Sequence, residues 1–145
     1  MAEQGYMRSL HERMGDYLDA ALRGYEIGNF EKFDNTFLVG DLRGLNFKFE
    51  FPRQLSPTST TRITASIIPA NLIEAKTPED ISVGLESIVA SLNRLLAKRD
   101  MLEQRGYHGE FYQDEKIPLE EMGYAYTIPT ETEDKIKRAI DDFLA

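Results

Sequence analysis

Histidine is the side chain most often used as a general base near neutral pH, and this chain contains two. His11 is followed by Glu12, but no second histidine comes at helical spacing, so the HExxH pattern of zinc enzymes is absent. His108, Glu110 and Asp114 are close enough in sequence to hold a metal ion from a strand and a turn. A polar cluster of this kind on an acidic protein is more typical of a solvated surface, and we expect no metal ion there.

Adjacent carboxylates are the other residues with acid–base chemistry. Catalysis by such a pair needs one carboxyl group that burial keeps protonated, whereas neighbours in sequence point in different directions. The first pair is explained by the favourable interaction of acidic groups with a helix N-terminus, and the others are interpreted as surface. We therefore assign no catalytic role to these pairs, which are Glu79-Asp80, Asp114-Glu115, Glu120-Glu121 and Asp141-Asp142.

Several kinds of cofactor site are excluded or not indicated. The chain has no cysteine, which excludes disulfides, thiolate nucleophiles and thiolate zinc sites. The segment Gly40–Gly44 lacks both the GK[ST] of phosphate-binding loops and the GxGxxG of dinucleotide-binding folds, and we interpret it as a turn between strands. We expect no cofactor.

Length and charge limit the class of protein. At 145 residues the chain has the usual size of one domain, and its 41% hydrophobic content is ordinary for a globular protein. Its formal net charge of -8 repels phosphate backbones, favours basic partners and keeps a protein soluble. We expect a single domain over residues 1–145 and no direct binding to nucleic acid.

The sequence predicts no association with a membrane. Met1 to Leu18 carry charges throughout and lack the apolar core of a signal peptide. No apolar run approaches the length needed to span a bilayer. We therefore expect a cytoplasmic protein.

Hydrophobic periodicity predicts a helix followed by strands in the first half of the chain. Apolar residues at steps of three and four indicate a helix within Met7–Tyr25. Thr36–Val39 is a short strand candidate, Phe47–Phe51 alternates three rings with polar residues, and Ile63–Ile67 alternates in the same way. Strands with one apolar and one polar face are typical of an antiparallel sheet covered on one side.

The second half predicts a long helix, two strands and a short helix. The long helix begins at the N-cap Thr77 and extends to about Arg105. Tyr107–Gln113 and Tyr124–Ile128 are strand candidates, and a capping box of Thr130 with Glu133 begins the last helix. The predicted class is α+β, an antiparallel sheet with the order α-β-β-β-α-β-β-α and the long central helix packed on one face.

The long helix carries a near-heptad apolar seam that Arg99 interrupts. One interpretation is that the seam packs only on the protein's own sheet. The other is that it continues beyond the sheet and meets a second copy, as in a symmetric dimer. The candidate interface on this seam comprises Ile88, Leu92, Leu95, Arg99 and Leu102.

This order of elements, in an acidic domain of this length, resembles the type III secretion chaperone-like fold, which includes class I effector chaperones and YbjN-like proteins. The resemblance covers nearly the whole chain and is carried by element order and size: the first helix, the Phe47–Phe51 and Ile63–Ile67 strands, the long helix, and Tyr124–Ile128 before the last helix. It implies a dimer whose interface uses the long helix, and a surface that holds an extended segment of a client protein.

Two features depart from the effector chaperones. The Pro- and Leu-rich stretches common in those chaperones are not evident, and the strands have polar outer faces at Lys48, Glu50 and Arg62. These departures favour a YbjN-like or unrelated binding domain. An extended partner segment is still able to add to a strand edge, where backbone hydrogen bonds supply affinity.

The leading hypothesis is a non-catalytic, chaperone-like protein-binding module that forms a homodimer. A first alternative is an acidic inhibitor or decoy, such as a phage-type protein, that blocks a basic nucleic-acid-binding groove. Its candidate acidic face comprises Glu110, Asp114, Glu115, Glu120 and Glu121. A second alternative is a small ligand-binding domain or enzyme with a pocket lined by Tyr17, Tyr25, Phe47 and Tyr126.

Overall fold

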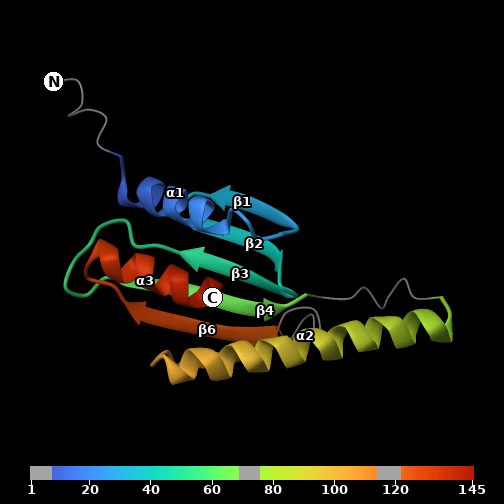
Figure 1. Ribbon diagram of the computed structural model, residues 1–145. Helices are drawn as coiled ribbons and strands as arrows, with labels where there is room; N and C mark the ends of the chain where they lie inside the picture. Colours follow the sequence, from blue (N-terminus) through green and yellow to red (C-terminus); the bar gives the residue numbers. More distant parts are fainter. Residues whose placement is uncertain (1–7, 69–75, 114–121) are drawn as a thin grey trace.

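The computed structural model describes residues 8–68, 76–113 and 122–145, which form a mixed α+β fold (Figure 1). Three helices and six strands follow one another in the order α-β-β-β-β-α-β-β-α. This confirms the predicted class and adds one strand to the predicted order. The elements are α1 (Leu10–Leu22), β1 (Asn29–Phe33), β2 (Thr36–Leu42), β3 (Leu45–Glu50), β4 (Thr60–Ile67), α2 (Pro78–Gln104), β5 (Gly109–Gln113), β6 (Met122–Pro129) and α3 (Glu133–Leu144).

All six strands belong to one antiparallel sheet with the spatial order β1-β2-β3-β4-β6-β5. The strand that sequence periodicity missed is β1, at the edge. Its residues are mostly exposed on both faces, so it lacks the alternation by which a half-buried strand is recognised. Its partner β2 is also longer than predicted, because it runs through Gly40 and Asp41 to Leu42.

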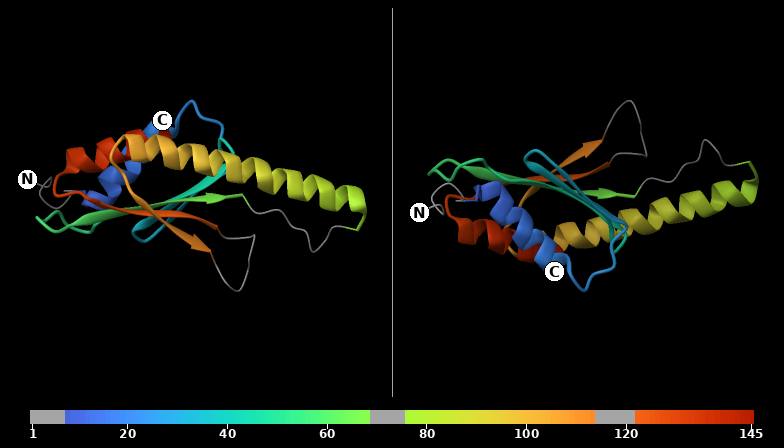
Figure 2. Two further views of the ribbon diagram at one scale, coloured as in Figure 1. Left: turned by 90° about the horizontal axis from the view of Figure 1, so that it is seen from below. Right: turned by 90° about the horizontal axis from the view of Figure 1, so that it is seen from above.

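The core lies between the helices and one face of the sheet. The three helices lie on the same side of the sheet in both views of Figure 2. Phe47, Phe49 and Phe51 all point to that side and are at most 3% exposed, as their alternation predicts. The opposite face is polar and is not covered by any of the described helices.

Helix α2 begins where its capping signals predict. The Thr77 side chain accepts a hydrogen bond from the Asp80 backbone N–H at 3.1 Å, and Pro78 occupies the first turn. The C-terminal half of the helix packs on the sheet, whereas the N-terminal half runs beyond the ends of the strands (Figures 1 and 2). The helix is therefore longer than the sheet it covers.

Helix α3 begins two residues later than the predicted capping box. Thr132 is the N-cap, and its side chain accepts from the Lys135 backbone N–H. Thr130 is fully buried instead, with its hydroxyl 2.9 Å from that of Thr61 in β4. A buried hydroxyl needs a partner, and here the pairing fixes the end of β6 against β4.

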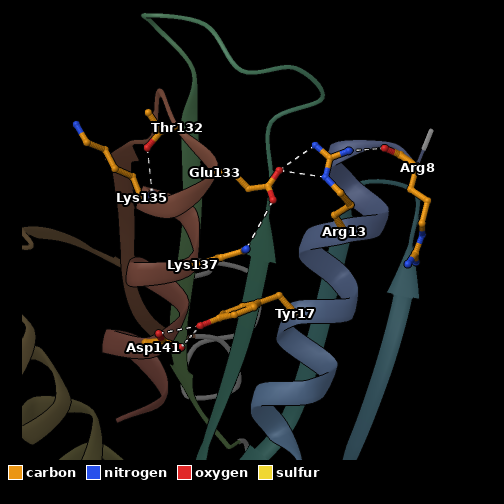
Figure 3. Close-up of polar contacts among 8 residues, drawn as sticks. All are labelled: Arg8, Arg13, Tyr17, Thr132, Glu133, Lys135, Lys137 and Asp141. Atoms are coloured by element: carbon orange, nitrogen blue, oxygen red, sulfur yellow. Dashed lines mark hydrogen bonds and ion pairs between the residues drawn. The ribbon is translucent and has the colours of Figure 1, made fainter. Parts of the chain in front are cut away.

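Polar contacts join the outer edges of α1 and α3 (Figure 3). Arg13 donates from Nε and Nη2 to the same oxygen of Glu133, at 3.1 and 2.9 Å. The Tyr17 hydroxyl lies 2.9 Å from both carboxylate oxygens of Asp141, and this hydrogen bond raises the pKa of Tyr17. These contacts fix how the two helices pack side by side over the Phe-rich face.

None of the helices in the described part of the chain is both long and apolar enough to cross a membrane.

Candidate functional site

Three of the five predicted interface residues lie in the protein's own core. Ile88, Leu95 and Leu102 are 4%, 2% and 0% exposed, and they face the sheet. Leu92 is half-buried beside them. The structure therefore assigns most of the predicted seam to packing within the monomer, and a charge placed at Leu95 would disrupt the fold rather than an interface.

Arg99, the fifth of these residues, makes contacts within its own chain. Its guanidinium lies 5.5 Å from the centroid of the Tyr124 ring and donates to the Tyr124 hydroxyl at 3.0 Å. It also donates from Nε and Nη2 to Asp100 at 3.1 and 2.9 Å. Arg99, the residue that interrupts the apolar seam, thus connects α2 to β6.

A second apolar stripe on α2, which shares Leu92 with the predicted interface, is open to solvent. Ile81, Leu85, Val89 and Leu96 are between 40% and 55% exposed, and half-buried Leu92 lies among them. At 100° per residue these side chains occupy one continuous strip beside the core-facing side of the helix. We call this set the α2 stripe: Ile81, Leu85, Val89, Leu92 and Leu96.

Large exposed aliphatic groups in one strip are unusual for the surface of a monomer, where they occur singly. The N-terminal part of the α2 stripe lies where the helix has passed beyond the strands, so no described element covers it (Figure 1). The signal in the sequence is the apolar periodicity of the long helix, in which Ile81, Leu85 and Leu92 belong to the near-heptad seam and Val89 and Leu96 lie alongside it. Periodicity alone did not reveal which of the two adjacent strips faces the sheet.

Only one residue of the predicted acidic face is described. Glu110 lies exposed on the edge strand β5. Asp114, Glu115, Glu120 and Glu121 lie outside the described residues. The acidic-face hypothesis therefore stays a prediction.

The four aromatic residues predicted to line a pocket do not share one. Phe47 and Tyr126 are buried in the core, at 3% and 1% exposed. Tyr126 packs edge-to-face on Phe143 with ring centroids 5.0 Å apart. Tyr17 and Tyr25 do lie together, in a surface pocket between α1 and the end of α3 that Asp141 and Leu144 also line. The structure therefore brings two of the four predicted residues to one pocket and buries the other two in the core.

No group of His, Asp or Glu among the described residues is placed to hold a metal ion, and Asp114, the predicted neighbour of His108, lies outside them. His11 stacks on Phe37 at a centroid distance of 4.5 Å, at the edge of the core. Burial lowers its pKa, and Asp34 and Glu12 oppose that shift. His108 is exposed in the connection between α2 and β5.

The two edge strands of the described sheet are further surfaces able to meet another chain. Each of β1 and β5 pairs with a neighbour on one side only among the described strands. Each also carries an exposed ring, Phe33 at 53% and Phe111 at 55%. Exposed strand edges offer backbone groups to an added strand.

No family model, curated protein or solved structure matches this chain. The likeness to secretion-chaperone folds therefore stays a resemblance in element order, and the function has to be argued from the surfaces described above.

Proposed function

We propose that this protein is a non-catalytic, homodimeric protein-binding module in which α2 of one copy packs antiparallel against α2 of a second copy. The observation that carries the proposal is the α2 stripe, a strip of exposed aliphatic side chains on a helix that outruns its own sheet. Covering such a strip removes apolar surface from water, at about 25 cal/mol for each Å² buried.

The spacing of the stripe favours a second copy as the occupant. Ile81 and Leu96 are its ends, each four residues from Leu85 and Leu92, with Val89 near the middle. The stripe therefore reads nearly the same in either direction. Two copies related by a two-fold axis near Val89 bring Ile81 opposite Leu96 and Leu85 opposite Leu92, as an isologous interface requires.

Charge supports the same orientation. The first turn of α2 is acidic at Glu79 and Asp80. Antiparallel pairing separates the acidic turns of the two copies, whereas parallel pairing places these like charges together. The stripe lies beside the core-facing residues, so a partner helix is able to bind it without displacing the sheet. In an antiparallel pair the sheets of the two copies lie at opposite ends of the paired helices.

A client protein is proposed to bind as an added strand. The edge strand β5 supports this, because it has a free side among the described strands and an exposed Phe111 ring packed edge-to-face on Tyr124 at 5.5 Å. Backbone hydrogen bonds to the edge supply affinity, and alternate side chains of the client meet the exposed ring.

The first test replaces one exposed aliphatic residue by a charge. Leu85→Glu places a carboxylate against an apolar surface in each half of the interface, and we expect the dimer to weaken about 100-fold or more. Val83→Glu is the matched control, since Val83 is 65% exposed but lies on the far side of α2 from the stripe. Sedimentation velocity over a range of concentrations measures both variants beside the original protein.

The expected outcome is a dimer for the original protein and for Val83→Glu, and a folded monomer for Leu85→Glu. A circular dichroism spectrum identical to that of the original protein establishes that the monomer is folded. The proposal is wrong if the original protein is monomeric, or if Leu85→Glu is folded and still dimeric.

A second test determines the direction of the pairing. Because the chain has no cysteine, a single introduced thiol reports on one position. Val89→Cys lies close to the proposed two-fold axis and is expected to form an intermolecular disulfide on mild oxidation. Ile81→Cys is the control, because antiparallel pairing separates its two thiols by about 22 Å along the helix axis. Equal cross-linking at both positions would indicate parallel helices.

A further inference from the structure

A second feature of α2 is a hollow on the side opposite the α2 stripe. This cavity of about 260 Å³ lies between the β2–β3 turn, α2 and the end of α3. Its floor is apolar and includes Leu45, Phe47 and Leu144, which are at most 4% exposed. A concave apolar floor is what a small ligand needs for the apolar part of its binding energy.

The rim of the cavity carries three cations: Arg43, Arg94 and Lys98. Arg94 and Lys98 are one helical turn apart on α2. Arg43 comes from the two-residue turn that joins Leu42 to Leu45, where both Arg43 and Gly44 have positive φ angles, 53° and 84°. The hairpin and the helix thus bring their charges to one place.

Glycine at position 44 is what allows Arg94 to lie there. A Cβ atom on Gly44 would lie 2.5 Å from Cδ and 2.6 Å from Nη1 of Arg94. The guanidinium therefore rests directly against the backbone of the turn. The Arg43 guanidinium stacks on the Tyr25 ring, 4.8 Å from the ring centroid.

The positive charge on this rim has no side-chain carboxylate to balance it. No Asp or Glu lines the cavity, and in the described part of the chain neither Arg43 nor Arg94 has an acidic side chain within 4.0 Å. Lys98 already has partners, because it donates to the backbone oxygen of Phe143 at 3.0 Å and to an oxygen of Ala145, the last residue of the sequence, at 2.7 Å. The unbalanced charge on the rim is therefore that of Arg43 and Arg94. Burial, and then the charges of Arg43 and Arg105, lower the pKa of Lys98 to about 8.

This concentration of cations contrasts with the rest of a chain whose net charge is -8. We propose that the cavity binds a small amphipathic carboxylate, with its apolar body against Leu45, Phe47 and Leu144 and its carboxylate paired with Arg43 and Arg94. Guanidinium groups hold carboxylates through paired, charge-assisted hydrogen bonds. The volume is just below the usual range of ligand pockets and suits a chain or ring of modest size.

The cavity lies apart from the proposed dimer interface. The α2 residues that line the cavity, Arg94, Lys98 and Met101, point away from the α2 stripe at 100° per residue. Ligand binding therefore does not compete with the helix pair, and either proposal is able to fail while the other holds.

The test is a titration of the ¹⁵N-labelled full chain with octanoate, followed through its backbone amide resonances. We expect saturable shifts at residues 42–47, 94–101 and 144. Acetate supplies the headgroup without the tail, 1-octanol the tail without the charge, and octylammonium the opposite charge. All three are expected to bind at least about 10-fold more weakly, because each lacks one of the two interactions.

Two variants assign the binding to the rim. Arg94→Gln is expected to weaken octanoate binding at least about 10-fold. If Arg94→Gln does not fold, Arg43→Gln takes its place, with the same expected loss of affinity. Arg62→Gln is the charge-matched control, on the far face of the sheet, and is expected to bind like the original protein. The proposal is overturned by absent or non-saturating shifts, by shifts confined to the α2 stripe, by equal shifts with octylammonium, or by equal losses in Arg62→Gln and Arg94→Gln.

Discussion

Phe143→Ala is expected to lower the free energy of unfolding by about 3–5 kcal/mol. Phe143 is fully buried on α3 and packs edge-to-face on two tyrosines, with ring centroids 5.2 Å from Tyr107 and 5.0 Å from Tyr126. Those rings come from the segment after α2 and from β6, so this side chain joins α3 to two other parts of the fold. Truncation removes the transfer free energy of the ring and leaves a cavity that its neighbours only partly fill.

The same substitution at an exposed position is the control. Phe111 is 55% exposed on β5, and Phe111→Ala is expected to cost less than about 1 kcal/mol. Urea denaturation followed by circular dichroism measures both variants at one protein concentration, because a dimer would make stability depend on concentration. Similar midpoints for the two variants would show that α3 is not essential to the core.

Gly123→Ala is expected to destabilise the protein by about 3 kcal/mol. A Cβ atom at this position of β6 would lie 2.2 Å from the carbonyl oxygen of Ala65 and 2.8 Å from Cα of Ser66. Both atoms belong to the backbone of β4, which cannot move aside as a side chain does. The added methyl group therefore forces β4 and β6 apart where Gly123 pairs with Ser66.

Thr127→Ala is the matched control on the same strand. Thr127 is exposed on the same face of β6 and pairs with Arg62, and its replacement is expected to cost less than about 1 kcal/mol. Thermal unfolding gives the comparison, and amide hydrogen exchange at β4 and β6 locates the damage. A Gly123→Ala variant as stable as the original protein would mean that the close approach of the two strands is not needed.

The sequence predicted the elements that bury one face. The alternating rings of Phe47–Phe51, the capped start of α2 and the amphipathic α3 each carry a periodic apolar pattern, and each element forms as expected. The edge strand β1 carries no such pattern, because its side chains are exposed on both faces. Its pairing depends on the hairpin with β2, which hydrophobic periodicity does not report.

The candidate surfaces were harder to predict for a different reason. The heptad seam on α2 was visible, but Leu95 in that seam faces the sheet while Val89 beside it faces solvent. When a helix carries two adjacent apolar strips, the sequence does not reveal which strip is buried and which is exposed, because that depends on where the sheet lies. The cationic rim was not predicted at all, because the β2–β3 turn supplies Arg43 and α2 supplies Arg94, far away in sequence.

The pairing of β4 with β6 has a consequence for how the chain folds. These two interior strands pair with Thr64 opposite Ala125, about 60 residues apart in sequence, and the whole of α2 and β5 lies between them in the chain. During synthesis β1 to β4 are able to pair before the rest of the chain has been made. The side of β4 that later pairs with β6 stays exposed until β6 has emerged. We expect this long-range closure to be the slow step of folding, and the open edge of β4 to be the site at which nascent chains are most prone to aggregate.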